Sequence, residues 1–447
     1  MRVTGPEPTE VGPDGRLLWR LYGEQFDFEP FVRKHPGGEI AIRLAQGIEC
    51  TSLFESYHPA RSGARRVLDE YRFHDKTPAT ELMMAPAAAP VKPPYTSPFK
   101  RDLDEMVAAH FAGKGRNAHK ATTGHMLVCM CFFVAELFCW AGWVRGSWAA
   151  AVTLPVFFWL TAVNVSHDAS HMAFSSKGWV NEICTFAALP LLYEPTTWYY
   201  LHVISHHVHT NDVAVDADLQ HFAPLKLHGR DKREHPQGLA RVNQFLKMAG
   251  VAVHLCLLVP LFNIDALRPP DYQDNYSPAV WIPAGLKPHL KHRLASALGP
   301  LVNLSLILYS LAAFGIVKGL LFIIVPWGLC SVIFLLVTQV SHIQPEVQAA
   351  ELQNEPDFFK RQATTSVDYW VNSNFARIYT GGLNVQALHH SLPYVSSCHY
   401  TDLYPGFHAV CARHGIKIAS RRSAFHAIAT MAQHVWTTNG GWAQLSQ

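Results

Sequence analysis

Four long hydrophobic segments constrain the fold of this chain most. They cover about residues 126–144, 148–165, 301–317 and 319–340. Each approaches the ~20 residues that a helix needs to cross a bilayer, and the only charged residue within them is Glu136. Little more than Arg145 and Gly146 separates the first two segments, and Lys318 separates the last two. The sequence therefore predicts a mainly α-helical protein with four membrane-spanning helices in two tight hairpins.

The topology follows from the flanking residues. Two shorter apolar stretches, 183–193 and 248–262, are ambiguous, and we interpret both as re-entrant or interfacial pieces. If only one of them crossed the membrane, the histidines before and after it would face opposite sides. Basic residues cluster at 100–120 and 287–293, before the first and third spans, and the positive-inside rule makes these flanks cytosolic. A multi-pass membrane protein with cytosolic N- and C-termini is expected, because the polar first residues lack the apolar core of a signal peptide.

Composition divides the chain into three parts. Residues 1–76 have the mixed charge of a small soluble domain, residues 77–98 form an Ala/Pro-rich linker, and residues 99–447 form the membrane domain. The net charge of +3 is too small to indicate a nucleic-acid partner. The most unusual number is 26 histidines, so their positions carry most of the functional argument.

Histidines gather at three places in the membrane domain, with one more directly after the fourth span. These residues are His167 and His171, then His202, His206 and His207, then His342, and finally Gln386, His389 and His390. Residues four apart share one face of a helix, so His167 and His171 can aim at one metal, and so can His202 and His206. Adjacent histidines diverge, so each adjacent pair can serve two neighbouring metals. The four-span topology predicts that all of them lie together on the cytosolic side. Neutral imidazole is a good ligand for iron.

This pattern resembles the membrane fatty-acid desaturase and hydroxylase superfamily, whose three histidine boxes it matches over about residues 125–410. The resemblance implies a di-iron centre with two iron ions. The implied ligands are His167, His171, His202, His206, His207, His342, His389 and His390, with Gln386 as a further candidate. Gln386 replaces the histidine that opens the third box in many members, as in front-end desaturases. The second box departs from the front-end pattern by one extra residue.

Several polar residues and further histidines lie near the boxes. We expect Asp168 to orient a ligand imidazole by a hydrogen bond to the ring rather than to bind metal itself. Asn211, Asp212, Asp216 and Asp218 follow the second box and either act in the same way or form a plain polar loop. The histidines that match no box are expected to be structural or exposed, namely His209, His221, His254 and His399.

The N-terminal part contains a second motif, His35-Pro36-Gly37-Gly38. A Pro-Gly-Gly turn permits a sharp reversal and a close backbone approach to a flat ligand. With His58 further along, the segment resembles cytochrome b5, a small α+β domain. The resemblance implies that His35 and His58 hold haem b from opposite faces. Two departures are a degenerate segment before the motif and Pro59 after the second histidine.

Together the two resemblances predict an enzyme, an O₂-dependent fatty-acid desaturase of polyunsaturated fatty acid synthesis. Removing hydrogen from an unactivated methylene needs a strong oxidant made from O₂ and two external electrons. The implied partners are a fatty acyl chain on phospholipid or coenzyme A, O₂, and a separate cytochrome b5 reductase, and the implied location is the endoplasmic reticulum. Alternatives are a sphingolipid desaturase or a fatty-acid hydroxylase. A membrane metal transporter is more remote, because it predicts ionisable groups within the spans, and only Glu136 is present.

Overall fold

The computed structural model describes residues 17–43, 45–59, 63–73, 97–213, 216, 219, 227–229 and 290–438. Within these residues, four helices are long and apolar enough to cross a membrane, as the sequence predicts. Their spans are Thr123–Val144, Trp148–Ser170, Ala297–Phe314 and Ile316–Thr338. They belong to helices α5 (Thr123–Val144), α6 (Trp148–Thr161), α14 (Leu290–Phe314) and α15 (Ile316–Thr338).

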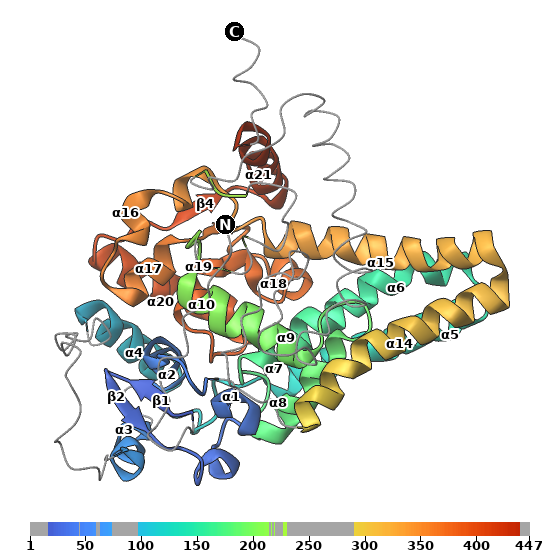
Figure 1. Cartoon of the computed structure of the whole chain (residues 1–447). Helices are drawn as coiled ribbons and strands as arrows, with labels where there is room; N and C mark the ends of the chain where they lie inside the picture. The colour runs from blue at the N-terminus through green and yellow to red at the C-terminus, as the bar shows by residue number, and fades with distance from the viewer. Residues whose placement is uncertain are drawn as a thin grey trace.

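The four helices form two hairpins that lie side by side and project from the rest of the molecule (Figure 1). Trp143, Phe158, Phe322 and Trp327 are buried between them. Large apolar side chains such as Phe138, Leu301 and Val317 face outward and are exposed. A band of exposed apolar side chains on long helices fits contact with lipid rather than with water.

The second hairpin turns at a different residue from the one expected. Helix α14 ends at Phe314 and α15 begins at Ile316, so the turn lies at Gly315, where φ is +75°, and not at Lys318. Glycine tolerates this positive φ without steric cost, whereas lysine does not. Lys318 instead lies in α15, where its Nζ donates to the carbonyl of Gly146 at 3.2 Å and lies 5.0 Å from the ring centroids of Phe314 and Phe322. Lys318 therefore joins the tips of both hairpins.

The ambiguous stretch 183–193 does not form a span. It begins at the end of α8 (Gly178–Cys184) and continues into a 3-10 helix, Thr185–Ala188, both much too short to cross a bilayer. The other stretch, 248–262, lies outside the described residues.

A helical cap covers one end of the membrane bundle. Its first element, α4 (Pro98–His110), buries Phe99, Leu103 and Val107 against α20 (Tyr400–Arg413). The other short elements are α7 (His167–Ser170), α9 (Pro195–Trp198), α10 (His207–His209), α16 (Ala350–Gln353), α17 (Phe358–Thr364), α18 (Asn374–Thr380), α19 (Gln386–Ser391), α21 (Ala424–Thr438), and the parallel strands β3 (Val367–Tyr369) and β4 (Ala419–Arg421).

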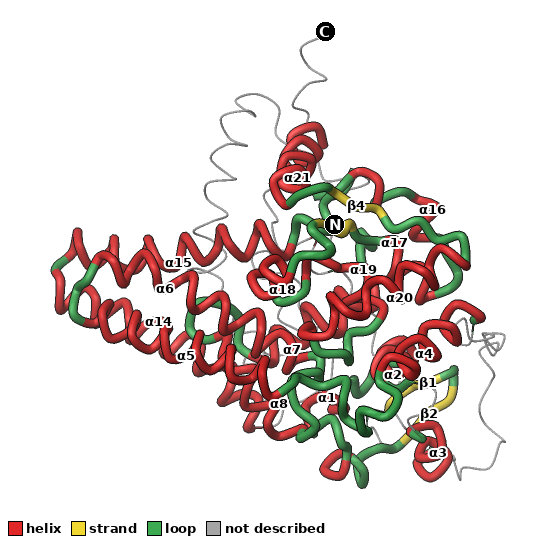
Figure 2. Tube along the Cα trace, turned by 180° about the vertical axis from the view of Figure 1, so that it is seen from behind, coloured by secondary structure: helices red, strands yellow, loops and turns green. Residues whose placement is uncertain are grey.

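The N-terminal part is a small α+β unit. Its strands β1 (Trp19–Leu21) and β2 (Glu24–Phe26) are antiparallel, and its helices are α1 (Glu39–Arg43), α2 (Thr51–Tyr57) and α3 (Ala64–Leu68). It packs directly on the cap, with α1 beside α8 in both views (Figures 1 and 2). Tyr199, Tyr200, Val203 and Ile204 from the cap belong to the same buried cluster as the core of this unit.

Candidate metal centre

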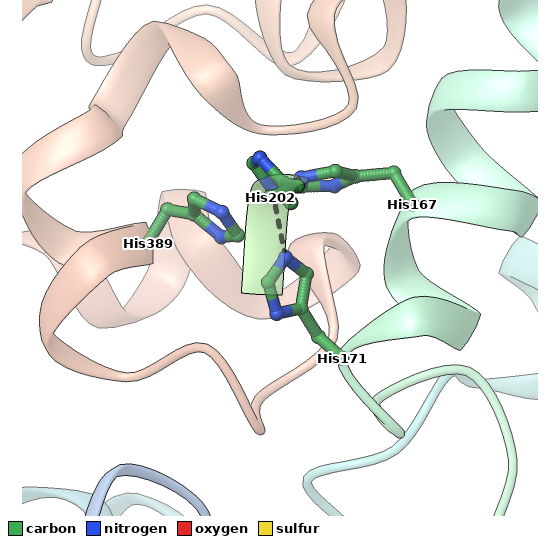
Figure 3. A group of neighbouring side chains, drawn as sticks. All are labelled: His167, His171, His202 and His389. Carbon is green, nitrogen blue, oxygen red and sulfur yellow. Dashed lines mark hydrogen bonds between the residues drawn. The ribbon is translucent and has the colours of Figure 1, made fainter. Parts of the chain in front are cut away.

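The box histidines converge in two groups at the junction between the spans and the cap. One group is formed by His167, His171, His202 and His389, and the other by His206, His342 and His390. Within each group the nitrogens that face one another all lie within 4.8 Å. The four imidazoles of the first group point toward one another from the end of the second span, the second box and α19 (Figure 3). No box histidine is more than 6% exposed.

The backbone of the second box explains how its histidines divide between the groups. Residues Tyr199–His206 form a π-helix, in which hydrogen bonds run from residue i to i+5. His202 and His207, five positions apart, therefore bring their Nε2 atoms within 3.2 Å of each other. His206 turns to the second group, where its Nε2 lies 3.2 Å from that of His342. The prediction that His202 and His206 share one metal is wrong, because it assumed α-helical periodicity.

The same π-helix accommodates the extra residue of the second box. A π-turn holds one residue more than an α-turn, so HVISHH presents its first and last histidines to the same group. The adjacent pair His206-His207 is thereby split between the groups. His389-His390 is split in the same way, since Nε2 of His389 lies 3.1 Å from Nε2 of His207 while His390 belongs to the second group.

The first group cannot be satisfied by hydrogen bonds among its own side chains. Nε2 of His202 lies 3.1–3.2 Å from the Nε2 atoms of His167, His171 and His207. A neutral imidazole nitrogen takes part in one hydrogen bond as donor or as acceptor, so it cannot satisfy three such neighbours. A buried polar atom without a partner costs about 1–3 kcal/mol. Several nitrogen lone pairs directed at one point are what a metal ion requires, so the donor set fits a metal.

Partners on the far side of the rings fix where the protons lie. Nδ1 of His206 donates to the Asp216 carboxylate at 3.1 Å, and Nδ1 of His342 donates to the Thr365 carbonyl at 3.3 Å. Nδ1 of His390 donates to Oε1 of Gln362 at 3.0 Å. These oxygens only accept, so each proton sits on Nδ1 and each Nε2 presents its lone pair to the second group.

Two tyrosines complete this outer layer. The hydroxyl of Tyr400 lies 3.1 Å from Nδ1 of His389, and that of Tyr57 lies 2.6 Å from Nδ1 of His171. Sequence reasoning missed Gln362, Tyr400 and Tyr57, because no motif marks them and each lies outside the histidine boxes. Asp216, by contrast, has the orienting contact that the sequence suggested.

Burial keeps the imidazoles neutral. Desolvation lowers the pKa well below 6.5 for His171, His202, His207, His342, His389 and His390. Neighbouring imidazoles act in the same direction, since a second positive charge nearby is unfavourable. Neutral imidazole is the form that ligates a metal, so the site is ready to bind at physiological pH.

Gln386 is buried beside the second group. Its side-chain nitrogen is 2.8 Å from Nε2 of His342 and 3.2 Å from Nε2 of His390, while its Oε1 is buried without a hydrogen-bond partner. The two ends of an amide have nearly the same shape, so a half-turn would direct Oε1 into the group. Gln386 can therefore either donate to these imidazoles or offer an oxygen ligand.

The contacts of Asp168 do not match its expected role. Its carboxylate accepts from the Ser396 hydroxyl at 2.6 Å and from the Ser397 amide at 3.1 Å, and it bonds to no imidazole in the described part of the chain. It ties α7 to the segment after α19, so it braces two boxes through the backbone.

The remaining candidates lie outside both groups. Asn211 donates from its side chain to the carbonyls of Val347 and Thr365, and its backbone N–H donates to Asp216 at 2.7 Å. His209, His399 and Asp212 are not members of either group. Asp218, His221 and His254 lie outside the described residues.

The N-terminal unit brings its two candidate histidines close together, with their rings inclined at 62° to each other. The ring centroids of His35 and His58 are 6.0 Å apart. Nδ1 of His35 donates to the Gly38 carbonyl at 3.0 Å and Nδ1 of His58 donates to the Phe54 carbonyl at 2.9 Å, which leaves both Nε2 atoms free. A Cβ at Gly37 would lie 2.8 Å from Cε1 of His35, so the turn leaves no room for a side chain there. Burial, followed by the proximity of His35, lowers the pKa of His58 to about 4. Two neutral opposed imidazoles fit a haem iron.

Comparison with known proteins agrees with both sites. Residues 143–422 match the family described as fatty acid desaturase, and residues 11–76 match the cytochrome b5-like haem/steroid-binding domain. This chain belongs to the fatty acid desaturase family. The predicted enzyme class is therefore confirmed, and the structure confirms the mainly helical fold with four long apolar helices and a small cytochrome b5-like N-terminal unit.

Relatives of this desaturase share nearly its whole length. The acyl-lipid omega-13 desaturase of Chlamydomonas reinhardtii is 28% identical, over 94% of this chain and 92% of its own. The acyl-lipid (8-3)-desaturase of Mortierella alpina is 25% identical, over 94% of this chain and 93% of its own. The Delta(8)-fatty-acid desaturase 2 of Arabidopsis thaliana is 22% identical, over 97% and 91%.

Proposed function

We propose that this desaturase inserts a double bond into a fatty acyl chain at a di-iron centre, between an existing double bond and the carboxyl end. The observation that carries the proposal is the division of both adjacent histidine pairs between two groups of buried, neutral imidazoles. One iron ion belongs to each group. Gln386 in the third box and the (8-3)- and Delta(8)-specific relatives support the front-end position.

The ligands follow from the two groups. We assign His167, His171, His202, His207 and His389 to the first iron. We assign His206, His342 and His390 to the second, with Gln386 beside it. When bound, the irons supply the oxidant that removes two hydrogens from the acyl chain, with O₂ as the ultimate electron acceptor.

The protein contributes position and a dry environment. Asp216, Gln362 and the Thr365 carbonyl keep the protons on Nδ1, so the ligand faces of His206, His390 and His342 stay open. Burial of every box histidine keeps bulk water away from the reacting carbons. The acyl chain would approach this site from the spans, whose buried apolar side chains include Phe334 and Val337.

The remaining assignments complete this proposal. Residues 1–76 form the haem domain, 77–98 the linker and 99–447 the desaturase domain. A separate cytochrome b5 reductase reduces the haem b held by His35 and His58. The substrate is carried on phospholipid or coenzyme A, and the protein lies in the endoplasmic reticulum with both termini in the cytosol. The relatives named as acyl-lipid desaturases favour an acyl chain carried on a lipid over one carried on coenzyme A.

Lipid analysis of a producing host tests the proposal. A yeast-like host that supplies reductase would express wild type, His389→Ala and, as control, His408→Ala, whose imidazole is exposed on α20. After feeding with a panel of unsaturated fatty acids, mass spectrometry should detect a lipid lighter than its precursor by two hydrogens in wild type and control only. A new bond on the carboxyl side of the existing one supports front-end desaturation.

Other products would contradict the proposal in distinguishable ways. A product heavier by one oxygen would identify a hydroxylase. A new double bond confined to the sphingoid base would identify a sphingolipid desaturase. Equal product from wild type and His389→Ala would remove the histidine site from the reaction.

A further inference from the structure

Tyr57 joins the two redox sites of this chain. It is the last residue of α2 in the haem domain, directly before His58. Its hydroxyl lies 2.6 Å from Nδ1 of His171 in the first histidine group, and the two rings are nearly parallel, at 11°. Successive residues of a helix point about 100° apart, so His58 can face His35 while Tyr57 faces the metal group. A single peptide unit therefore separates a haem-facing residue from a residue that touches a metal-facing imidazole.

The contact is part of a docked interface. The backbone N–H of Ile40 in α1 donates to the Glu182 carboxylate in α8 at 3.1 Å. A Cβ at Gly178 would lie 2.5 Å from the backbone nitrogen of Gly38, so the His-Pro-Gly-Gly turn rests on the start of α8 with no space between. Tyr199 and Val203, from the π-helix that carries the second box, share the buried core of the haem domain.

The direction of the hydrogen bond suits a metal ligand. Nε2 of His171 faces Nε2 of His202 at 3.1 Å, so its metal-binding tautomer carries the proton on Nδ1. Nδ1 then donates to the Tyr57 oxygen, as Nδ1 of His206 donates to Asp216. Five box histidines have an Nδ1 partner in the described structure. The partner of His171 belongs to the haem domain, whereas those of His206, His342, His389 and His390 belong to the desaturase domain.

We propose that the Tyr57–His171 contact is the junction through which the docked haem domain positions a metal ligand and delivers electrons to the first group. The inference rests on the proposed di-iron function. With haem held by His35 and His58 and iron held by the first group, each transfer would oxidise the haem by one electron and reduce the iron by one, with no bond formed or broken and no proton moved. Two transfers supply one desaturation, and an external haem reductase restores the ferrous haem after each.

Reoxidation of the haem in the full-length protein tests this junction. The purified protein, loaded with haem and iron, would be reduced and mixed with acyl substrate and O₂, and haem absorbance would report the electron leaving. Tyr57→Phe removes only the hydroxyl and should slow reoxidation about tenfold or more, the usual cost of losing an outer partner of a ligand. Tyr22→Phe is the matched control, because its hydroxyl bonds to Glu55 within the haem domain.

A second pair of variants tests the docking of the haem domain independently of the Tyr57 hydroxyl. Gly178→Ala places a methyl against Gly38, whereas Gly124→Ala meets nothing within 4 Å. Gly178→Ala should slow haem reoxidation as Tyr57→Phe does, and the control should not. Hydrogen exchange supplies a readout that is independent of turnover. The backbone amide of Ile40 should exchange faster in Gly178→Ala than in wild type and in Gly124→Ala.

The outcomes decide between the two proposals. Wild-type reoxidation in Tyr57→Phe, with unchanged haem spectrum and iron content, would overturn the junction. Slow reoxidation in Gly124→Ala or Tyr22→Phe would overturn it as well, since any small change would then suffice. If wild type itself binds no iron, or reoxidises its haem no faster than a His389→Ala protein, the di-iron function fails instead.

Discussion

The carboxylate of Asp216 accepts a hydrogen bond from Nδ1 of His206, with both of its oxygens 3.1 Å from that nitrogen. One of these oxygens also accepts from the backbone N–H of Asn211 at 2.7 Å, which fixes the carboxylate from behind. Asp216 is fully buried, so its charge is not screened by water. An anionic partner makes the opposite nitrogen of the ring a stronger ligand.

Asp216→Asn should therefore weaken metal binding in the second group. Loss of an outer carboxylate partner usually costs about 10–100-fold in metal affinity. The measurement is iron retention during titration with a chelator, with Asp402→Asn as control because Asp402 is exposed on α20. Equal retention in wild type and Asp216→Asn would show that this hydrogen bond does not support the metal.

Removing one histidine from one group should release the iron of that group and leave the other iron bound. His171→Ala and His342→Ala should each lose one iron of the two, because the residues belong to different groups. Elemental analysis of purified protein measures the stoichiometry, and His408→Ala should keep both irons. Loss of all iron from either variant alone would contradict two separately held ions.

The sequence identified the histidines but not their grouping. The boxes and the spans follow from local patterns, and all eight box histidines lie at the centre. The division of His202 and His206 between groups depends on a π-helix, whose extra residue per turn no local pattern reveals. The i, i+4 spacing of His202 and His206 predicted an α-helix that aims both at one metal. In the structure this segment is a π-helix, and its Tyr199 and Val203 pack against the core of the haem domain.

Contacts across long sequence separations were beyond sequence reasoning. Gln362 donates to the carbonyl of His207 and accepts from Nδ1 of His390, so it links the second and third boxes. Nothing around Gln362 in the sequence distinguishes it from any helix glutamine. The turn of the second hairpin is a simpler error. Sequence reasoning placed it at the charged Lys318, whereas it lies three residues earlier, at Gly315, which can adopt the positive φ that the turn requires.

The buried carboxyl of Asp368 should make the free energy of unfolding fall as the pH rises, whereas the buried histidines make it fall as the pH drops. Its carboxylate accepts from the Ala387 amide at 3.0 Å and from the Tyr404 hydroxyl at 2.9 Å, and burial raises its pKa to about 7. A carboxyl with a raised pKa stabilises the folded state below its unfolded pKa, 3.8, and this stabilisation is lost as the pH rises to about 7. For the buried histidines, whose pKa is lowered, stability is instead lost as the pH falls below 6.5.

Comparison with Asp368→Asn isolates the carboxyl, because the histidine contribution is common to both proteins. Between about pH 5 and pH 8, wild type should lose on the order of 2 kcal/mol of unfolding free energy relative to Asp368→Asn. Thermal unfolding in detergent measures the difference at each pH. Parallel pH profiles for the two proteins would contradict a raised pKa for the Asp368 carboxyl.

Gln386 gives the last prediction, because its amide lies between two ligand faces. The protons of His342 and His390 sit on Nδ1, so both Nε2 atoms present lone pairs toward Gln386. An iron in the second group would compete for these lone pairs, and the amide would then turn its unpartnered Oε1 toward the metal. Gln386→Ala should lower iron affinity in the second group and leave the first group occupied, while Gln386→His should restore it with a stronger ligand. Chelator titration of the three proteins measures this order. Equal affinity in wild type and Gln386→Ala would mean that the amide only fills space beside the site.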